Sequence, residues 1–232
     1  MEARKFYIET YGCQMNEADS ELVIGLLRGA NYQLTAIPEE ADLILINSCS
    51  VRENAEKRAI ARLAQFKSLK KKKPELLLGL IGCVAQRNYD EILTENKFVD
   101  LVLGPDSYRN LPEYLNQEQM PIVDVNLSRT EVYDELIPSR NSAVNAWVSI
   151  MRGCNKFCTF CIVPYVRGRE RSRSPQSIID EIRQALNDGY REVTLLGQNV
   201  NSYHYGAYRF PELLEVVAAV PDLRRIRFTS PH

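Results

Sequence analysis

The sequence is poor in histidine, in unbalanced charge and in long apolar runs. Its two histidines, His204 and His232, do not have the spacing of a zinc finger, and a structural zinc site needs four ligands. Twenty-nine basic residues face 30 acidic ones, so the net charge of −1 gives no global basic field and any nucleic-acid contact must use local patches. The longest apolar run, Leu76 to Val84, is strand-sized and too short to span a bilayer.

The N-terminus also lacks the apolar run of a signal peptide, since it reads Met-Glu-Ala-Arg-Lys. Disulfides among the six cysteines would require an oxidising compartment, so we expect reduced thiols, a cytoplasmic location and no membrane partner. The length of 232 residues, with 45% apolar and 25% charged residues, suits one large domain or two small ones.

Three cysteines, Cys154, Cys158 and Cys161, stand at C-x3-C-x2-C spacing directly after the apolar run 147–151. Thiolates are the soft ligands that iron in a sulfide cluster prefers. A [4Fe-4S] cubane has four irons, so three protein ligands leave one iron open to an outside ligand, as an open position does in catalytic zinc sites. The spacing therefore predicts a cluster with one vacant iron.

The first half of the chain alternates between predicted strands and helices. Strands are expected at residues 5–10, 41–47, 75–81, 98–103 and 122–125, and helices at 16–30, 53–73 and 111–115. Such alternation predicts an α/β domain with a parallel sheet over residues 1–145. Residues 126–145, rich in polar side chains, are expected to form a linker at its end.

The remaining cysteines each follow a predicted strand, precede a helix and come after a small residue. They are Cys13, Cys49 and Cys83, preceded by Gly12, Ser48 and Gly82. They are 36 and 34 residues apart, and the loops after parallel strands emerge at one edge of a sheet, so the thiols are expected to be neighbours. We predict a second three-ligand cluster here, and the alternative is three buried cysteines that act as small hydrophobes.

The second half, residues 146–232, continues with strands expected at 147–151, 191–196 and 223–228 and helices between them. Ser174 is predicted to cap a helix that starts with Pro175 and ends at Gly189. Three strand-helix units are too few to close a barrel and would leave a bare edge. We therefore expect the first part of a (β/α) barrel and a chain that is an N-terminal fragment of a longer protein.

Four motifs together resemble the radical S-adenosylmethionine (SAM) methylthiotransferases. They are Thr10–Asn16 (TYGCQMN), Asn47–Glu53 (NSCSVRE), Gly82–Arg87 (GCVAQR) and Gly153–Cys161 (GCNKFCTFC). The first two, with Leu195–Asn201 (LLGQNVN), are similar to the MiaB branch, which modifies tRNA. The resemblance implies transfer of a 2-methylthio group to an isopentenylated adenosine beside the anticodon, with SAM and two [4Fe-4S] clusters as cofactors. Its fold would be a parallel-sheet methylthiotransferase domain followed by a truncated radical SAM barrel.

The resemblance also implies roles for individual residues. Cys154, Cys158 and Cys161 would hold the SAM-binding cluster, and Cys13, Cys49 and Cys83 the auxiliary cluster. Phe160 would either position the adenine of SAM or pack in the core, and Gln198 and Asn199 would either contact its methionine part or cap a loop. The arginines are expected either to clamp tRNA phosphates or to lie in a solvated loop; they are Arg167, Arg169, Arg171 and Arg173.

Expected partners are the tRNA anticodon stem-loop and an electron donor of the flavodoxin or ferredoxin type, with the chain itself a monomer. Two alternatives remain open. The dense arginines at 167–173 are closer to the MtaB branch, so the substrate would be threonylcarbamoyladenosine tRNA, or else a ribosomal protein. A more distant alternative is a two-cluster electron-transfer protein that never cleaves SAM.

Overall fold

The structure, a computed structural model, describes residues 3–51, 53–140 and 144–229. Arg52 of the second motif, residues 141–143 of the expected linker and His232 lie outside the described residues. The chain forms two compact units, residues 1–127 and 128–232. This division falls at the start of the stretch 126–145 that was predicted to be a linker.

Unit 1 is built on a parallel sheet with the strand order β2-β1-β3-β4-β5-β6, which confirms the predicted sheet. Its strands are β1 (Arg4–Tyr11), β2 (Tyr32–Leu34), β3 (Leu43–Ser48), β4 (Leu77–Gly82), β5 (Leu101–Leu103) and β6 (Ile122–Asp124). Only β2 was not predicted. It follows Asn31, whose φ of 65° reverses the chain after the first helix, and it pairs with the start of β1.

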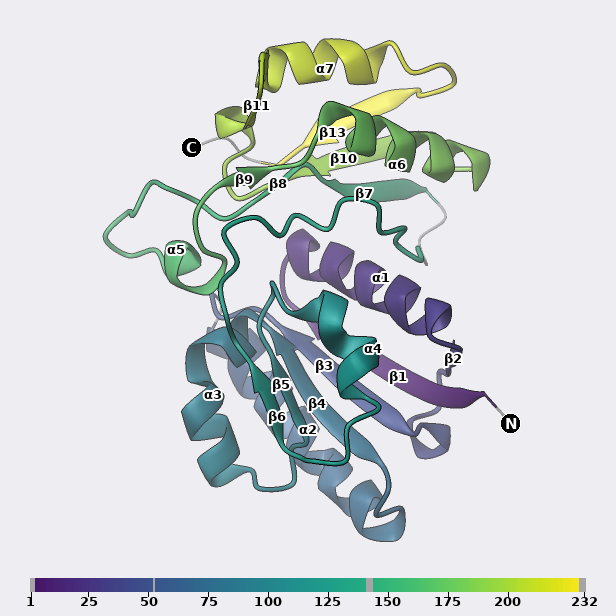
Figure 1. Ribbon diagram of the computed structural model, residues 1–232, viewed down its shortest axis with the longest axis vertical. Coiled ribbons are helices and arrows are strands. Elements are labelled where there is room, and N and C mark those ends of the chain that lie inside the picture. The colour runs from purple at the N-terminus through teal and green to yellow at the C-terminus, as the bar shows by residue number, and fades with distance from the viewer. Residues whose placement is uncertain (1–2, 52, 141–143, 230–232) are drawn as a thin grey trace. The chain divides into compact units, whose positions relative to one another are not determined.

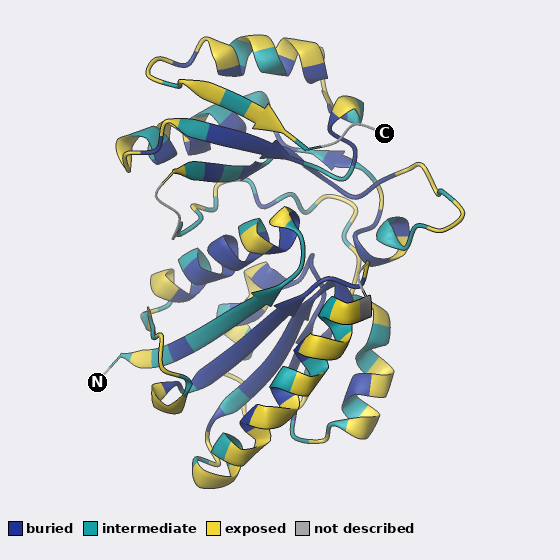
Figure 2. Cartoon of the chain, turned by 180° about the vertical axis from the view of Figure 1, so that it is seen from behind, coloured by how far each residue is buried: buried dark blue, intermediate teal, exposed yellow. Residues whose placement is uncertain are grey.

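Helices cover both faces of this sheet: α1 (Gln14–Gly29) and the short α4 (Leu111–Tyr114) lie on one face, and α2 (Glu53–Lys72) and α3 (Cys83–Glu95) on the other (Figure 1). Two single-turn helices, η1 (Pro38–Glu40) and η2 (Tyr108–Asn110), complete the unit. All six residues of β3 are buried, as its continuous apolar sequence predicts. Figure 2 shows the buried central strands between helices whose outer faces are exposed.

Unit 2 contains a three-stranded parallel sheet with β10 (Glu192–Leu196) between β7 (Asn145–Ser149) and β13 (Arg225–Phe228). The helices α6 (Pro175–Asn187) and α7 (Phe210–Ala218) bury their apolar stripes in one core with the sheet. Strands that are consecutive in this repeat are neighbours in the sheet, as at the start of a (β/α) barrel. The predicted cap is confirmed, because Ser174 Oγ accepts a hydrogen bond from the Ser177 backbone N–H at 3.1 Å.

Unit 2 also contains shorter elements that were not predicted. They are β8 (Met151–Arg152), which pairs antiparallel with β9 (Arg171–Ser172), the hairpin β11 (His204–Tyr205) and β12 (Tyr208–Arg209), the one-turn helix α5 (Val163–Val166), and η3 (Val200–Ser202). The pairing of β8 with β9 returns the chain to the barrel strands after the cysteine-containing loop.

The segment expected to be a linker is packed onto unit 2 wherever it is described. Residues 128–140 contain no helix or strand, yet Tyr133 is 3% exposed and the Arg171 guanidinium donates to the carbonyls of Ser128 and Glu131. Polar composition predicts an exposed tether at this point. Partners some 40 residues later in the chain instead bind its backbone and order it.

Candidate metal centres

The register of unit 1 brings three cysteines to one edge of the sheet. Tyr11, Ser48 and Gly82 are aligned at the carboxyl ends of β1, β3 and β4. Cys13 is the N-cap of α1, Cys49 directly follows β3, and Cys83 is the first residue of α3. The Cys49 backbone N–H donates to the Tyr11 carbonyl at 2.9 Å, which holds two of these loops together. The predicted placement of the three loops at one edge is thus found in the structure.

All six cysteines are free thiols, and in unit 1 Cys49 and Cys83 are buried while Cys13 is half-buried. The hydrogen bond with Cys13, then burial and the nearness of Cys83, raise the pKa of the Cys49 thiol. Such mutual influence requires the three thiols to be close neighbours. Among the described residues, however, no three Cys, His, Asp or Glu side chains converge tightly enough to hold a single metal ion.

A buried pair of amides lies beneath this site. Asn16, on α1, and Asn47, at the end of β3, are both 0% exposed, and Asn16 Nδ2 donates to Asn47 Oδ1 at 3.0 Å. Asn47 Nδ2 donates in turn to the Asn16 carbonyl and to Ser20 Oγ, both at 2.9 Å. The Cys13 thiol donates to Asn16 Oδ1 at 3.4 Å. The amide pair therefore links two cysteine loops and orients one of their sulfurs.

Two of the small residues that precede the cysteines are required by this amide pair. A Cβ on Gly12 would lie 2.5 Å from Asn16 Oδ1 and 2.9 Å from Cys49 Cβ. Gly82 has a φ of +92°, and a Cβ there would meet Asn47 Oδ1 and, at 2.9 Å, the Ser48 carbonyl. A small residue before each cysteine would also let the backbone come close to the sulfurs of a cluster. The structure adds a second reason, which is close packing against the two asparagines.

Asn16 and Asn47 were not predicted to be parts of the site. Both were quoted only within motifs, and their signal is that a buried polar residue stands three positions after Cys13 and another two positions before Cys49. A buried amide with its hydrogen bonds satisfied fixes one arrangement of the groups around it.

The second trio of cysteines lies in a loop of unit 2 that is fixed by its backbone. Gly153 has a φ of +78°, and a Cβ there would strike the Gly168 and Arg169 carbonyls. The Cys154 N–H donates to the Gly168 carbonyl at 3.0 Å, and the Cys161 N–H donates to the Cys158 carbonyl at 2.9 Å. Cys154 is 8% exposed, while Cys158 and Cys161 are half-buried. The loop therefore leaves two of its three thiols accessible.

A reciprocal pair of hydrogen bonds closes the same loop. The Asn155 N–H donates to the Glu170 carboxylate and the Glu170 N–H donates to Asn155 Oδ1, both at 3.2 Å. These bonds join Asn155, the residue after Cys154, to Glu170, the residue before β9. The loop is thus held to residues 168–170 along its first half.

Arg171 organises the backbone on which this loop rests. Its guanidinium donates to four carbonyls, those of Ser128 (2.8 Å), Glu131 (3.0 Å), Arg169 (3.2 Å) and Arg167 (3.3 Å). Arg171 is 7% exposed, Arg173 and Arg167 are each 4% exposed, and Arg169 is exposed. The prediction that these arginines clamp tRNA phosphates is wrong for Arg167, Arg171 and Arg173, because buried guanidinium groups cannot reach a phosphate. It stays a prediction for Arg169.

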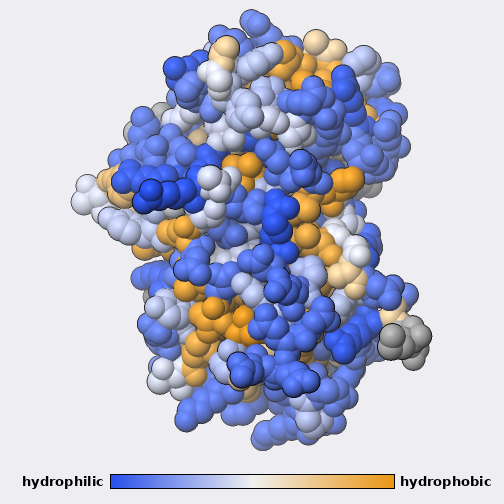
Figure 3. Space-filling model, in the orientation of Figure 1, coloured by the Kyte–Doolittle hydropathy of each residue, from blue (hydrophilic) through white to orange (hydrophobic). Residues whose placement is uncertain are grey.

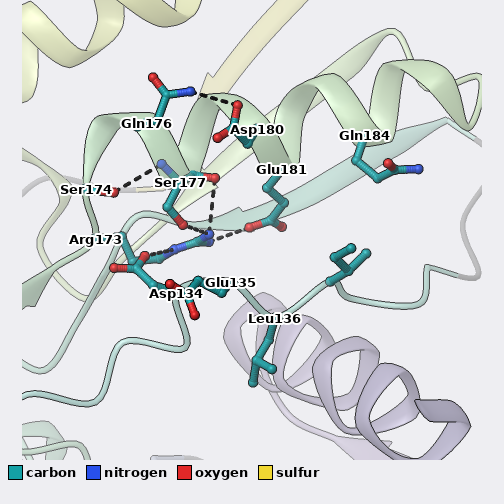
Figure 4. A pocket seen from close by; sticks show the side chains of 11 residues that line it. Asp134, Glu135, Leu136, Arg173, Ser174, Gln176, Ser177, Asp180, Glu181 and Gln184 are labelled. Atoms are coloured by element: carbon teal, nitrogen blue, oxygen red, sulfur yellow. Dashed lines mark hydrogen bonds and ion pairs between the residues drawn. The ribbon is translucent and has the colours of Figure 1, made fainter.

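Arg173 lies in a cavity of about 500 Å³ between α6 and residues 134–137 (Figure 4). It forms ion pairs with Glu181 and Asp134, and Glu181 also pairs with Arg140. Burial lowers the pKa of Arg173, but the two carboxylates outweigh that effect and raise it overall, so the group stays charged. None of the residues that line this cavity is a cysteine. We therefore treat it as separate from the metal centres.

The residues predicted to contact SAM lie in two parts of unit 2. Phe160 is 93% exposed, so the alternative that it packs in the core is wrong, and its contact with adenine stays a prediction. Asn199 is 1% exposed and its Nδ2 donates to Ser202 Oγ, which fits the loop-capping alternative. The Gln198 Oε1 atom is buried and has no hydrogen-bond partner among the described residues. A buried acceptor without a partner suits a ligand that supplies a donor.

Comparison with known proteins also divides the chain into an N-terminal and a C-terminal part. Residues 5–104 match a family described as "Uncharacterized protein family UPF0004", and residues 148–232 match the Radical SAM superfamily. Over 99% of its length the chain is 50% identical to the tRNA-2-methylthio-N(6)-dimethylallyladenosine synthase of Azobacteroides pseudotrichonymphae and 52% identical to that of Porphyromonas gingivalis W83. The chain belongs to the radical SAM methylthiotransferase family.

This methylthiotransferase chain spans about half the length of the curated relatives that it matches, 52% in both cases. Its fold is similar to that of the radical S-adenosylmethionine methyltransferase TsrM from Kitasatospora setae, with a TM-score of 0.63 over 96% of this chain and 54% of that one at 11% identity. None of its described helices has the length and apolarity that crossing a membrane requires.

Proposed function

We propose that this methylthiotransferase acts on tRNA and converts an isopentenylated adenosine beside the anticodon to its 2-methylthio derivative. The observation that carries the proposal is the presence of two separate trios of free cysteines in a chain about 50% identical, over nearly its whole length, to synthases named for that product. The electron-transfer alternative would leave the match to the Radical SAM superfamily over residues 148–232 without a role.

The two trios suit two [4Fe-4S] clusters. Cys154, Cys158 and Cys161 would hold the cluster that binds SAM, and Cys13, Cys49 and Cys83 the auxiliary one. Three soft thiol donors in each trio fit iron-sulfur chemistry better than a hard cation such as Mg²⁺ or Ca²⁺, which prefers oxygen ligands. When bound, SAM and the clusters supply the one-electron chemistry and the sulfur that functionalising an unactivated aromatic C–H bond requires.

The chain's own residues would bind SAM and hold the cysteine loops in place. The Gln198 Oε1 atom is a free acceptor at the carboxyl end of β10, where the amino group of the SAM methionine part would be its donor. The exposed Phe160 ring next to Cys161 offers a flat apolar surface to the adenine. At the other site, Asn16 and Asn47 hold the Cys13 and Cys49 loops at a fixed spacing.

The partners follow from this chemistry. The substrate would be the anticodon stem-loop of a tRNA, and a flavodoxin- or ferredoxin-type protein would deliver electrons to the clusters. The enzyme would act as a monomer.

The cluster assignment is tested by iron and sulfide analysis after anaerobic reconstitution of the full-length enzyme. We expect about eight irons per chain, which corresponds to two [4Fe-4S] clusters. Replacement of either cysteine trio by alanine should leave about four. Each trio is the matched control for the other. Iron that does not fall when Cys13, Cys49 and Cys83 are replaced would remove the auxiliary cluster, and SAM cleavage that survives Cys158→Ala would contradict the division of roles.

The substrate is tested by mass analysis of tRNA nucleosides from cells that lack the gene. We expect the isopentenylated adenosine to accumulate without its methylthio group and the threonylcarbamoyl derivatives to stay unchanged. Normal levels of 2-methylthio-isopentenyladenosine would reject the assignment, and loss of a methylthiolated threonylcarbamoyladenosine would support the other branch.

A further inference from the structure

Three exposed side chains, those of Phe157, Tyr165 and Arg169, gather at the loop of Cys154, Cys158 and Cys161. Phe157 is 42% exposed and Tyr165, on α5, is 64% exposed, and their rings meet edge to face at 6.0 Å with an interplanar angle of 89°. The Arg169 guanidinium lies 4.5 Å from the centre of the Phe157 ring. We name Phe157, Tyr165 and Arg169 the aromatic shelf.

The shelf is not explained by the packing of unit 2. Large apolar side chains gathered on a surface mark interaction sites more often than isolated ones do. Phe157 also has a φ of +47°, a left-handed conformation that is unfavourable for a bulky L-residue. The fold thus tolerates a strained backbone while it leaves this ring partly exposed next to Cys158.

The charge around the shelf is positive. Lys156 and Arg169 are both exposed, whereas the carboxylate of Glu170 accepts a hydrogen bond from the Asn155 N–H. Figure 3 shows strongly hydrophilic and apolar side chains side by side on the loop that projects next to α5. Aromatic faces interleaved with cationic groups are the combination that binds single-stranded nucleic acid, because bases stack on rings and phosphates pair with the cations.

We propose that the aromatic shelf stacks an unpaired base of the RNA loop next to the adenosine that is modified. This inference rests on the proposed function and names the residues that hold the substrate. Tyr165 is the more exposed of the two aromatic residues and stacks the base, while Arg169, which lies over the Phe157 ring, pairs with a phosphate. The shelf therefore binds the flanking nucleotide and helps to keep the target base at the cysteine loop.

The test uses the full-length reconstituted enzyme and a fluorescein-labelled anticodon stem-loop RNA that carries isopentenyladenosine, with binding followed by anisotropy. Tyr165→Ala is expected to weaken binding roughly 5- to 150-fold, which is the value of one stacked base. Tyr165→Phe should restore affinity, since it keeps the ring. Tyr205→Ala, which removes another half-exposed tyrosine of unit 2 on β11, should bind as the wild type does.

Abasic substitution along the RNA loop identifies the stacked base. At one position, removal of the base should weaken wild-type binding by the same factor as Tyr165→Ala, and the two changes together should cost no more than either alone. Iron content per chain shows whether each variant retains its folded cluster loop.

Wild-type affinity for Tyr165→Ala, or an equal loss of affinity for a fully double-stranded RNA of the same length, would overturn the shelf and leave the proposed function intact. A wild-type enzyme that neither binds nor modifies the stem-loop would overturn the proposed function itself.

Discussion

The Asn16 side chain donates from Nδ2 to Asn47 Oδ1 at 3.0 Å, and its own Oδ1 accepts from the Cys13 thiol at 3.4 Å. The orientation of the pair is set by the Asn16 backbone carbonyl, which can only accept and therefore faces Asn47 Nδ2. A change at either asparagine alters both cysteine loops.

Replacement of Asn47 by alanine is expected to destabilise unit 1. The change leaves the Asn16 amide and carbonyl without their partner, which costs about 1–3 kcal/mol per stranded buried group. Urea unfolding of the apoprotein measures the loss, with Asn116→Ala as the control because the Asn116 side chain is exposed and donates to the Pro112 carbonyl. Equal midpoints for the two variants would contradict this account.

Gly82→Ala is expected to reduce both stability and the iron bound by Cys13, Cys49 and Cys83. The left-handed φ of +92° is costly for alanine, by about 1–2 kcal/mol, and the added Cβ meets Asn47 and Ser48 as well. Gly29→Ala is the matched control, since nothing lies within 4 Å of its Cβ position at the end of α1. Iron content and the urea midpoint are the measurements, and a Gly82→Ala chain that matches the control would argue against close packing here.

Arg171→Ala is expected to destabilise the loop that carries Cys154, Cys158 and Cys161. Four carbonyls lose a charged donor at once, so we expect a loss of about 3 kcal/mol or more and reduced iron at Cys154, Cys158 and Cys161. Arg171→Lys should rescue little, because a single ammonium group does not reach the points that a guanidinium spans. Arg169→Ala removes an exposed arginine two residues away and should retain its iron. Full iron in Arg171→Ala would show that the loop holds its shape unaided.

Stability at high pH is expected to depend on Tyr11. Burial and the hydrogen bond to the Glu9 carboxylate raise the pKa of Tyr11 to about 12. Since the unfolded value is about 10, the contribution to stability is complete below that pH and is lost as the pH rises towards 12. Glu9→Gln should lower the pKa of Tyr11, as measured by the tyrosinate absorbance difference between chains with and without Tyr11→Phe. An unchanged pKa would assign the whole shift to burial.

The same carboxylate gives a prediction at low pH. Burial raises the pKa of Glu9, but hydrogen bonds from Arg62, Tyr11 and Tyr7 outweigh it and the net shift is downward. Its contribution to stability is therefore present above the unfolded pKa of about 4.3 and is lost as the pH falls through the lower folded value. Urea midpoints measured across this range should fall less steeply for Glu9→Gln than for the wild type, and parallel curves would contradict the shift.

The parallel sheet of unit 1 and the placement of the Cys13, Cys49 and Cys83 loops at one edge of it were predictable, because both follow from period and from the geometry of parallel strands. Apolar runs such as Leu43–Ser48 are unambiguous, and a parallel sheet brings the loops after its strands to one edge. The bounds of the longer helices followed from their apolar stripes for the same reason.

The burial of Arg167, Arg171 and Arg173 was not predictable from the sequence. Alternating arginines indicate a solvated or phosphate-binding stretch, and only tertiary structure supplies the carbonyls and carboxylates that satisfy them inside the protein. The ordered packing of residues 128–140 was not predictable for the same reason, because it too depends on tertiary contacts. Residues 128–140 have no period of their own and are ordered by those arginines.

The sheet edge of unit 1 and the loop of unit 2 differ in how much chain must be closed before their thiols meet. Cys13 and Cys83 are 70 positions apart in the chain and come to the same sheet edge only after β1, β3 and β4 have paired, whereas Cys154 and Cys161 are seven positions apart. Closing the longer span costs more chain entropy and makes its contacts slow to form. We therefore expect the loop to bind iron and sulfide before the sheet edge does when the unfolded full-length chain is refolded in their presence.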